Sequence, residues 1–302
     1  MSLHFMNRPM NRRAFLGTTS AAAAATLLTS RFGMAVDDHK IEKVGVQLYT
    51  VRDQMKADFE GTLAKVAAIG YKEVEFAGYF GRTPQQVRAA LEKNRLTSPS
   101  CHVDYAVLTP EKWPAQIESA KMIGQSYIVN PWIPEEQRKT DDDWKRAADT
   151  FNRAGAESKK AGIQFAYHNH WFEFLPVNGK RPYDMLLELC DKDLVKMELD
   201  LCWITVGGGD PLQYFERYPG RFPLVHVKDI KRLPPVTQAG TQDFGSSLKD
   251  MTEVGSGIID WKKIFAKSDE AGIKHYIVEH DHPAQPFESI RISYEYLSKL
   301  RW

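Results

Sequence analysis

The chain has 302 residues, of which 43% are hydrophobic and 26% are charged, and its formal net charge is +1. These values are ordinary for a globular protein with a buried core, and a charge so close to zero excludes the strongly basic surface that binding to nucleic acid or acidic lipid needs. The three cysteines are too few and too scattered for a disulfide framework or a cysteine-based zinc site.

The first 35 residues resemble an export signal. Arg12 and Arg13 precede the pair Phe15 and Leu16, and a weakly apolar, alanine-rich run follows from Gly17 to Leu28. Basic, apolar and small residues in this order are typical of a twin-arginine signal, and the run is too short to span a membrane. We therefore expect the twin-arginine export machinery as a partner, a periplasmic or secreted location, and no membrane span.

From residue 40 onward, strand-like runs alternate with helical patterns eight times. Runs rich in Val, Ile and Leu fit a parallel sheet covered by helices on both faces. Eight such units in about 265 residues match a (β/α)8 barrel. The expected strands are 44–49, 72–76, 98–104, 126–130, 162–169, 195–201, 222–228 and 274–279; the expected helices are 59–69, 83–94, 110–123, 141–160, 183–189, 211–218, 261–271 and 286–300.

We predict an α/β fold, a single-domain (β/α)8 TIM barrel over residues 40–302. A doubly wound open sheet is the rival fold, and it is disfavoured because no Gly-rich dinucleotide-binding turn follows the first strand. The segment from Lys231 to Asp260 is irregular and too long for an ordinary connection, which is typical of a functional loop.

Four consecutive strands end in metal-binding residue types. His168, Asp200, His226 and Glu279 lie at the carboxyl ends of strands five to eight, where the active site of such a barrel is found. Imidazole and carboxylate ligands without cysteine suit a borderline or hard divalent ion. We expect these four residues to bind one ion, Mn²⁺ in the first place, with Co²⁺, Mg²⁺ or Zn²⁺ as alternatives. His170 is the rival of His168 as a ligand.

The order of these motifs resembles one family. The runs 167–170, 198–200, 226–229 and 255–260, followed by Val278 and Glu279, are similar to those of the sugar phosphate isomerase/epimerase family, within the xylose isomerase-like TIM barrel superfamily. The resemblance implies a divalent metal held by Asp200, His226 and Glu279. His168 stands where many members have Glu, and the strand end around it is closer to that of the inosose dehydratases.

The chemistry that the resemblance implies is abstraction of a proton next to a carbonyl, with a metal polarising the oxygen. Glu279 is the expected base, His168 or His170 its counterpart, and Lys228 the group that stabilises an enolate. We expect a sugar isomerase or epimerase. A lyase that eliminates from a keto-sugar, keto-glycoside or inosose is the alternative, because both begin with the same deprotonation. A non-catalytic sugar-binding barrel is the second alternative.

A small sugar or sugar-derived molecule is the expected substrate. His102 and Glu75 end two earlier strands and, with Asn169, are expected to reach substrate hydroxyls. Trp132 and Trp203 follow strands four and six, where aromatic faces suit stacking on a sugar ring. A DNA-repair endonuclease of the same superfamily would have His in place of Trp203, so no nucleic-acid partner is expected. Homo-oligomerisation is left open.

Overall fold

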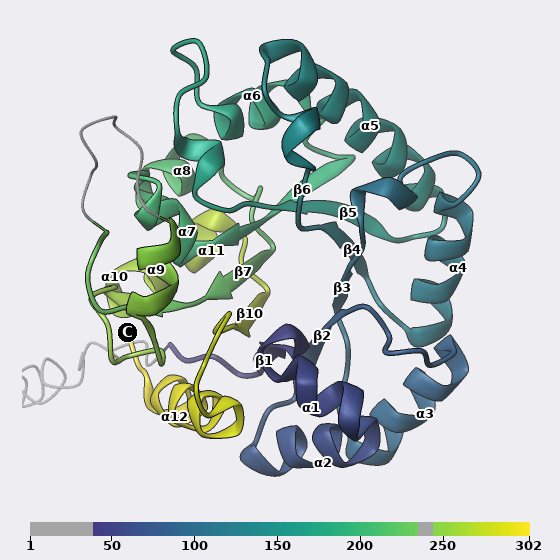
Figure 1. Ribbon diagram of the computed structural model, residues 1–302, viewed down its shortest axis with the longest axis vertical. Coiled ribbons are helices and arrows are strands. Elements are labelled where there is room, and N and C mark those ends of the chain that lie inside the picture. Colours follow the sequence, from purple (N-terminus) through teal and green to yellow (C-terminus); the bar gives the residue numbers. More distant parts are fainter. Residues whose placement is uncertain (1–38, 235–243) are drawn as a thin grey trace, which may run out of the picture. The chain divides into compact units, whose positions relative to one another are not determined.

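The structure of the protein is a computed structural model that describes residues 39–234 and 244–302. Residues Lys40–Trp302 form one compact unit, in which eight parallel strands close into a barrel (Figure 1). Around the ring, each strand lies beside its neighbour in the sequence, and the last strand pairs with the first. The predicted single-domain (β/α)8 TIM barrel is confirmed. Its strands are β1 (Val44–Gln47), β2 (Glu73–Ala77), β3 (Ser100–His102), β4 (Tyr127–Asn130), β5 (Gln164–His168), β6 (Val195–Asp200), β7 (Leu224–Val227) and β10 (His275–Val278).

The helices form the outer layer of the barrel. Buried side chains on their inner faces pack on the strands, for example Trp144 and Phe151 of the long helix α5. Capping boxes begin two helices, with Thr83 bonded to the Gln86 backbone and Thr140 to that of Asp143. The helices are α1 (Arg52–Ala57), α2 (Phe59–Ile69), α3 (Pro84–Asn94), α4 (Trp113–Ile123), α5 (Asp141–Lys160), α6 (Pro182–Leu189), α7 (Leu201–Val206), α8 (Pro211–Arg217), α9 (Phe244–Asp250), α10 (Trp261–Phe265), α11 (Ser268–Ala271) and α12 (Pro286–Lys299).

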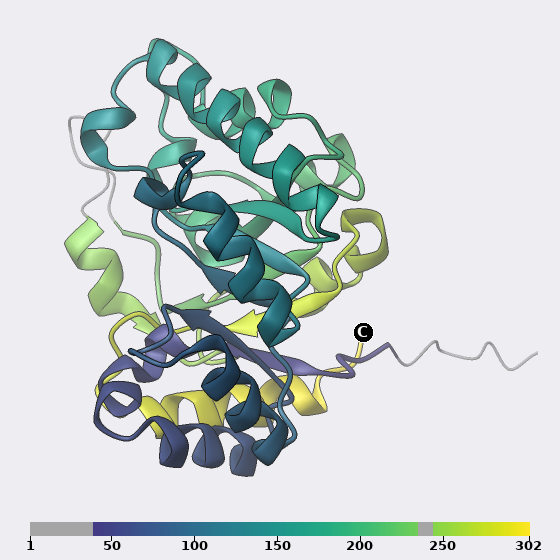
Figure 2. The same ribbon diagram turned by 90° about the vertical axis from the view of Figure 1, so that its right-hand side faces the viewer.

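The barrel closes where the two ends of the described chain meet. Strand β1 pairs with β10 through Val44 and Tyr276 and the two following pairs. The C-terminal helix α12 packs on β1 and α2, and the side view shows it in yellow beside the purple N-terminal helices (Figure 2). The side chain of Arg52 also donates to the backbone oxygen of Asp281, at 2.8 Å. Glu75 on β2 and Glu279, directly after β10, contact different ring nitrogens of His226, Nε2 and Nδ1.

The described part of the long segment from Lys231 to Asp260 contains regular structure. Residues Asp229–Ile230 (β8) and Met251–Thr252 (β9) form a two-stranded antiparallel sheet, and α9 precedes β9. The carboxylate of Asp229 accepts hydrogen bonds from the backbone of Gly255 and Gly257, and Gly257 lies so close to it that a Cβ would clash. This carboxylate holds the end of the segment against the barrel mouth.

The segment predicted as a twin-arginine signal, residues 1–35, lies outside the described residues. Among the described helices, none combines the length and the apolar composition that crossing a membrane requires.

Candidate active site

The strand register brings the four predicted ligands to the carboxyl end of the barrel. His168 pairs with Glu198 between β5 and β6, and Asp200 pairs with His226 between β6 and β7. Glu279 follows directly after β10. All four of the predicted ligands are buried. Because residues two apart on a strand share a face, Glu198 points inward together with Asp200.

Asp200, His226 and Glu279 form one group, which we call the outer group. Nδ1 of His226 lies 2.8 Å from Oε2 of Glu279 and 3.9 Å from Oδ2 of Asp200. Oδ1 of Asp200 caps helix α7 by accepting from the backbone of Cys202 and Trp203. Oδ2 of Asp200 is buried and lies 3.1 Å from Nζ of Lys228. A buried carboxylate oxygen next to an imidazole and a second carboxylate fits the donor set of a divalent cation.

His168 is the fourth neighbour of this group. Its Nε2 lies 3.9 Å from Oδ2 of Asp200. The ring of His170 lies beside that of His168, with 5.1 Å between ring centres, and packs edge-on against Trp132 at 5.0 Å. His168 and not His170 therefore faces the outer group. A divalent ion at this position would be held by Asp200, His226 and Glu279, with His168 closest among the remaining imidazoles.

Lys228 neutralises the carboxylates at the mouth. Its Nζ lies 2.7 Å from Oε2 of Glu279, 3.1 Å from Oδ2 of Asp200 and 3.1 Å from Oδ1 of Asp281. Burial by itself would lower the pKa of Lys228, but these carboxylates outweigh it and raise the pKa well above its usual value. Burial would raise the pKa of Glu279, yet Lys228 and His226 hold it below the usual range. The carboxylate of Glu279 is therefore ionised and a weak proton acceptor.

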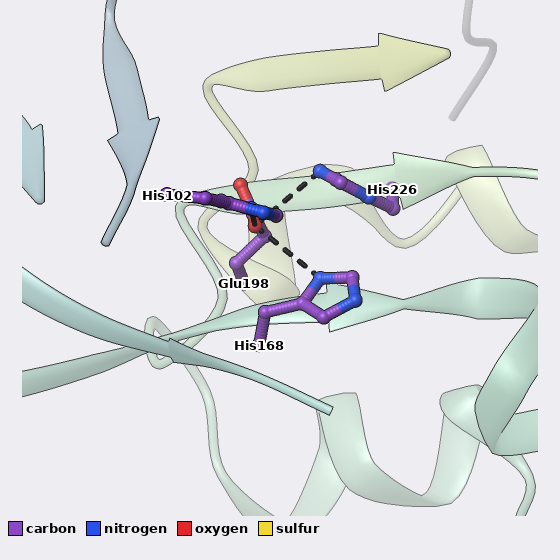
Figure 3. Close-up of side chains that lie close together, drawn as sticks. All are labelled: His102, His168, Glu198 and His226. Carbon is purple, nitrogen blue, oxygen red and sulfur yellow. Dashed lines mark hydrogen bonds and ion pairs between the residues drawn. The ribbon is translucent and has the colours of Figure 1, made fainter. Parts of the chain in front are cut away.

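Two carboxylates lie deeper in the barrel than the outer group. Oε2 of Glu198 is 2.7 Å from Nε2 of His102, and Oε2 of Glu75 is 2.7 Å from Nε2 of His226. The rings of His102, His168 and His226 surround the Glu198 carboxylate (Figure 3). We call His102, His168, Glu198 and His226 the inner group.

A cavity of ≈ 690 Å³ opens at the carboxyl end of the strands. Seven of the residues singled out from the sequence line it: His102, Trp132, His168, His170, Trp203, Lys228 and Glu279. Glu75 and Asn169, both expected to contact substrate, do not line the cavity and are fully buried. Glu75 instead accepts from Gln47 and meets His226, and Asn169 accepts from the backbone of Asp200. Both residues therefore contact the predicted metal ligands His226 and Asp200 and not the cavity.

Besides Glu198, Asp281 is a residue that the sequence analysis did not assign to the site. It lines the cavity, and Lys228 donates to both of its oxygens. Burial raises the pKa of Asp281 to about 6, although Lys228 opposes the shift. The signal was present in the sequence, because Asp281 lies two residues after Glu279. Tyr49 and Tyr79 also line the cavity.

A closed parallel barrel with carboxylates and imidazoles gathered at the carboxyl ends of its strands belongs to the class of sugar-modifying TIM barrel enzymes. The chain is a member of the Xylose isomerase-like TIM barrel family, whose pattern matches residues 63–300. It is 27% identical to an inosose dehydratase from Geobacillus kaustophilus over 79% of this chain and 86% of that protein.

The solved structures agree on the fold. A sugar phosphate isomerase/epimerase from Parabacteroides distasonis is similar with a TM-score of 0.69 and 29% identity, over 85% of this chain and 93% of that one. The IolI protein, solved with a bound zinc atom, has a TM-score of 0.66 at 16% identity, over 84% of this chain and 95% of that one. The predicted family is thus confirmed.

Proposed function

We propose that the protein is a metal-dependent lyase that removes a proton next to the carbonyl of a keto-sugar and expels a substituent from the neighbouring carbon. One observation carries this choice. His168 and His170 line the cavity together with Glu279, and His168 stands where many members of the resembled family have the Glu that a two-carboxylate proton exchange would use. The relatives named inosose dehydratase support the same class of reaction.

His170 is the proposed base. It lines the cavity, and its Nδ1 is buried without a hydrogen-bond partner. Burial and then the charge of Lys228 lower its pKa well below the usual value, so the ring is neutral at pH 7 and has a lone pair for the proton. Oε2 of Glu279 is already paired with Lys228 and His226, so Glu279 serves better in holding the ion than in accepting a proton.

The remaining steps follow from the cavity charges. When bound, the divalent ion supplies polarisation of the substrate carbonyl. His170 takes the proton from the adjacent carbon, and the electron pair of that C–H bond forms the carbon–carbon double bond of the enolate. The ammonium of Lys228 stabilises the developing negative charge. The enolate then re-forms the carbonyl, and its carbon–carbon electron pair forms a double bond to the next carbon. The bond from that carbon to its oxygen breaks, and the oxygen keeps the electron pair, takes the proton held by His170 and leaves as water or an alcohol.

An isomerase or epimerase is the second candidate, and the solved relative from Parabacteroides distasonis favours it by its name. The two reactions share the enolate and differ in the fate of its electron pair. In an isomerase the electron pair takes a proton at the neighbouring carbon, and in an epimerase it takes one on the opposite face of the same carbon. Neither reaction breaks a bond to oxygen.

The test uses Mn²⁺-loaded protein, keto-sugars and keto-glycosides with a β-substituent, and D₂O as solvent. We expect an unsaturated ketone together with released water or alcohol. Deuterated isomer without elimination would assign the isomerase reaction, and neither deuterium uptake nor elimination would refute both. His170→Gln is expected to lower the rate by about 10²–10⁴-fold. The matched control is His275→Gln, because His275 bonds to Glu73 at the opposite end of the barrel.

We also propose a route of export and a metal for the outer group. Arg12 and Arg13 support export through the twin-arginine machinery to the periplasm or outside the cell. The oxygen-rich outer group supports Mn²⁺ or Mg²⁺ as its ion. Metal analysis and fractionation of cells expressing the full chain test both.

A further inference from the structure

We infer that the barrel interior contains a second divalent-cation position, the inner site, formed by the inner group through Nε2 of His102, Nδ1 of His168, Nε2 of His226 and a carboxylate oxygen of Glu198. Its chemistry suits Zn²⁺ or a similar ion that prefers nitrogen ligands. This inference does not depend on the reaction proposed above.

The distances fit a small tetrahedral ion. Oε2 of Glu198 lies 3.3 Å from Nδ1 of His168 and 3.3 Å from Nε2 of His226. Ligands about 2.0–2.1 Å from a tetrahedral Zn²⁺ are separated from one another by about 3.3–3.4 Å. The third distance, 2.7 Å to Nε2 of His102, is that of a hydrogen bond, which an ion would replace. One donor atom from each member of the inner group lies within 4.8 Å of all the others. Figure 3 shows the three rings directed at the carboxylate.

Buried polar atoms in and beside the inner group have no hydrogen-bond partner. Glu75 and Glu198 are fully buried, and Oε2 of each lies within 3.3 Å of Nε2 of His226. Oε1 of Glu75, Oε1 of Glu198 and Nδ1 of His168 have no hydrogen-bond partner. Buried polar atoms without partners are uncommon in proteins, and two adjacent buried carboxylates need positive charge between them. An ion in the inner site would supply that charge and occupy the lone pair of His168.

The inner site shares two imidazoles with the outer group. His168 presents Nδ1 to Glu198 and Nε2 to Asp200. His226 presents Nε2 to Glu198 and Nδ1 to the outer carboxylates. A neutral imidazole has one acceptor nitrogen, so it can serve one ion at a time. Occupation of the inner site therefore withdraws ligands from the outer group.

The two donor sets favour different ions. The inner site offers three nitrogens and one oxygen, which suits Zn²⁺, Co²⁺ or Ni²⁺. The outer group offers two carboxylates and an imidazole, which suits Mn²⁺ or Mg²⁺. An ion can reach the inner site from the cavity, because His102 and His168 line its floor. Zn²⁺ in the inner site is thus expected to displace Mn²⁺ from the outer one.

The experiment measures metal affinity in the metal-free full chain, by competition with a chelator and by mass spectrometry of the bound metal. His102→Gln removes a ligand of the inner site only, and Asp200→Asn one of the outer group only. We expect His102→Gln to weaken Zn²⁺ binding at least about tenfold and to change Mn²⁺ binding less than about twofold. Asp200→Asn should do the reverse. Equal effects of both variants on both ions, or Zn²⁺ binding that depends on Asp200 and not on His102, would overturn the inner site.

A second measurement follows the competition directly. Zn²⁺ added to Mn²⁺-loaded protein should release Mn²⁺, seen as the electron paramagnetic resonance signal of the free ion, and His102→Gln should suppress the release. Release that is unchanged in His102→Gln would contradict the proposal. Glu73→Gln, at the other end of β2, is the matched control for folding. These readouts report bound metal and not turnover, so they are independent of whether the protein is a lyase.

Discussion

His226 on β7 and Glu75 on β2 meet across the barrel interior, with 2.7 Å between Nε2 and Oε2. The other ring nitrogen of His226 faces Glu279 of the outer group. A carboxylate that bonds the second nitrogen of a metal-binding histidine fixes its tautomer and its orientation. Glu75 is therefore a positioning residue for the outer group.

The first prediction concerns this contact. Glu75→Gln should weaken Mn²⁺ binding by about 10–100-fold, the effect usual for such supporting carboxylates. Chelator competition measures it. Glu73→Gln is the control, since Glu73 lies on the same strand and bonds His275 at 2.8 Å, away from the metal ligands. Equal affinity in wild type and Glu75→Gln would show that Glu75 does not orient His226.

A second prediction concerns pH. Burial raises the pKa of Glu173 to about 7, although Tyr167 and its other donors oppose the shift. The folded protein therefore binds this proton more tightly than the unfolded chain does, so stability falls as pH rises from about 4.5 to 7. We expect the free energy of unfolding, measured by urea titration at pH values between 4.5 and 8, to fall less with rising pH in Glu173→Gln than in wild type. Identical slopes would assign the pH dependence to other groups.

A third prediction concerns the loop before α10. The carboxylate of Asp229 accepts from the backbone of Gly255, Gly257, Ile259 and Ile230 and from the indole of Trp261. Asp229→Asn turns one acceptor into a donor that faces other donors, so we expect a loss of about 2–3 kcal/mol of unfolding free energy.

Denaturant titration measures this loss. The control is Asp260→Asn, because Asp260 caps α10 through the backbone of Lys263 and Asn is as good at this position. A loss as large in Asp260→Asn as in Asp229→Asn would mean that the loop does not depend on the Asp229 carboxylate.

The fourth prediction concerns the aromatic wall of the cavity. Trp132 is 39% exposed and lines the cavity, with the Arg138 guanidinium over its ring at 4.6 Å. If a sugar ring stacks there, Trp132→Ala raises KM by about five- to tenfold, corresponding to about 1–1.4 kcal/mol, and leaves kcat nearly unchanged. Trp132→Tyr should restore most of the binding. A fall in kcat at unchanged KM would place Trp132 outside the substrate contacts.

The barrel and the residues at its mouth were predictable because polar residues directly follow the apolar runs that form the strands. The residues after each apolar run, such as Asp200 and Glu279, are fixed at the mouth by the parallel arrangement alone. Alternation along β6 also places Glu198 and Asp200 on one face, and Asp281 lines the cavity with Glu279, two residues earlier in the sequence. The sequence analysis did not use this rule for Glu198 and Asp281, and it missed both.

Depth within the barrel was not predictable in the same way. Whether Glu75 reaches substrate or lies beneath it depends on how far neighbouring strands are staggered, which the sequence does not show. Likewise, His102 meets Glu198 because closure of the ring brings the side chains of β3 and β6 together in the barrel interior. The sheet β8–β9 was also missed, since strands of two residues have no periodicity to detect.

The pairing of β1 with β10 has a consequence for the order of assembly. Glu75 and Glu279 are separated from His226 by 151 and 53 residues, and β10 is the last strand to be synthesised. The proposed metal ligands come together only when the ring is complete, so an ion is expected to bind the finished barrel better than a partial one. A bound ion would therefore stabilise the closed ring, and hydrogen exchange at the β1–β10 seam should slow when the ion is added.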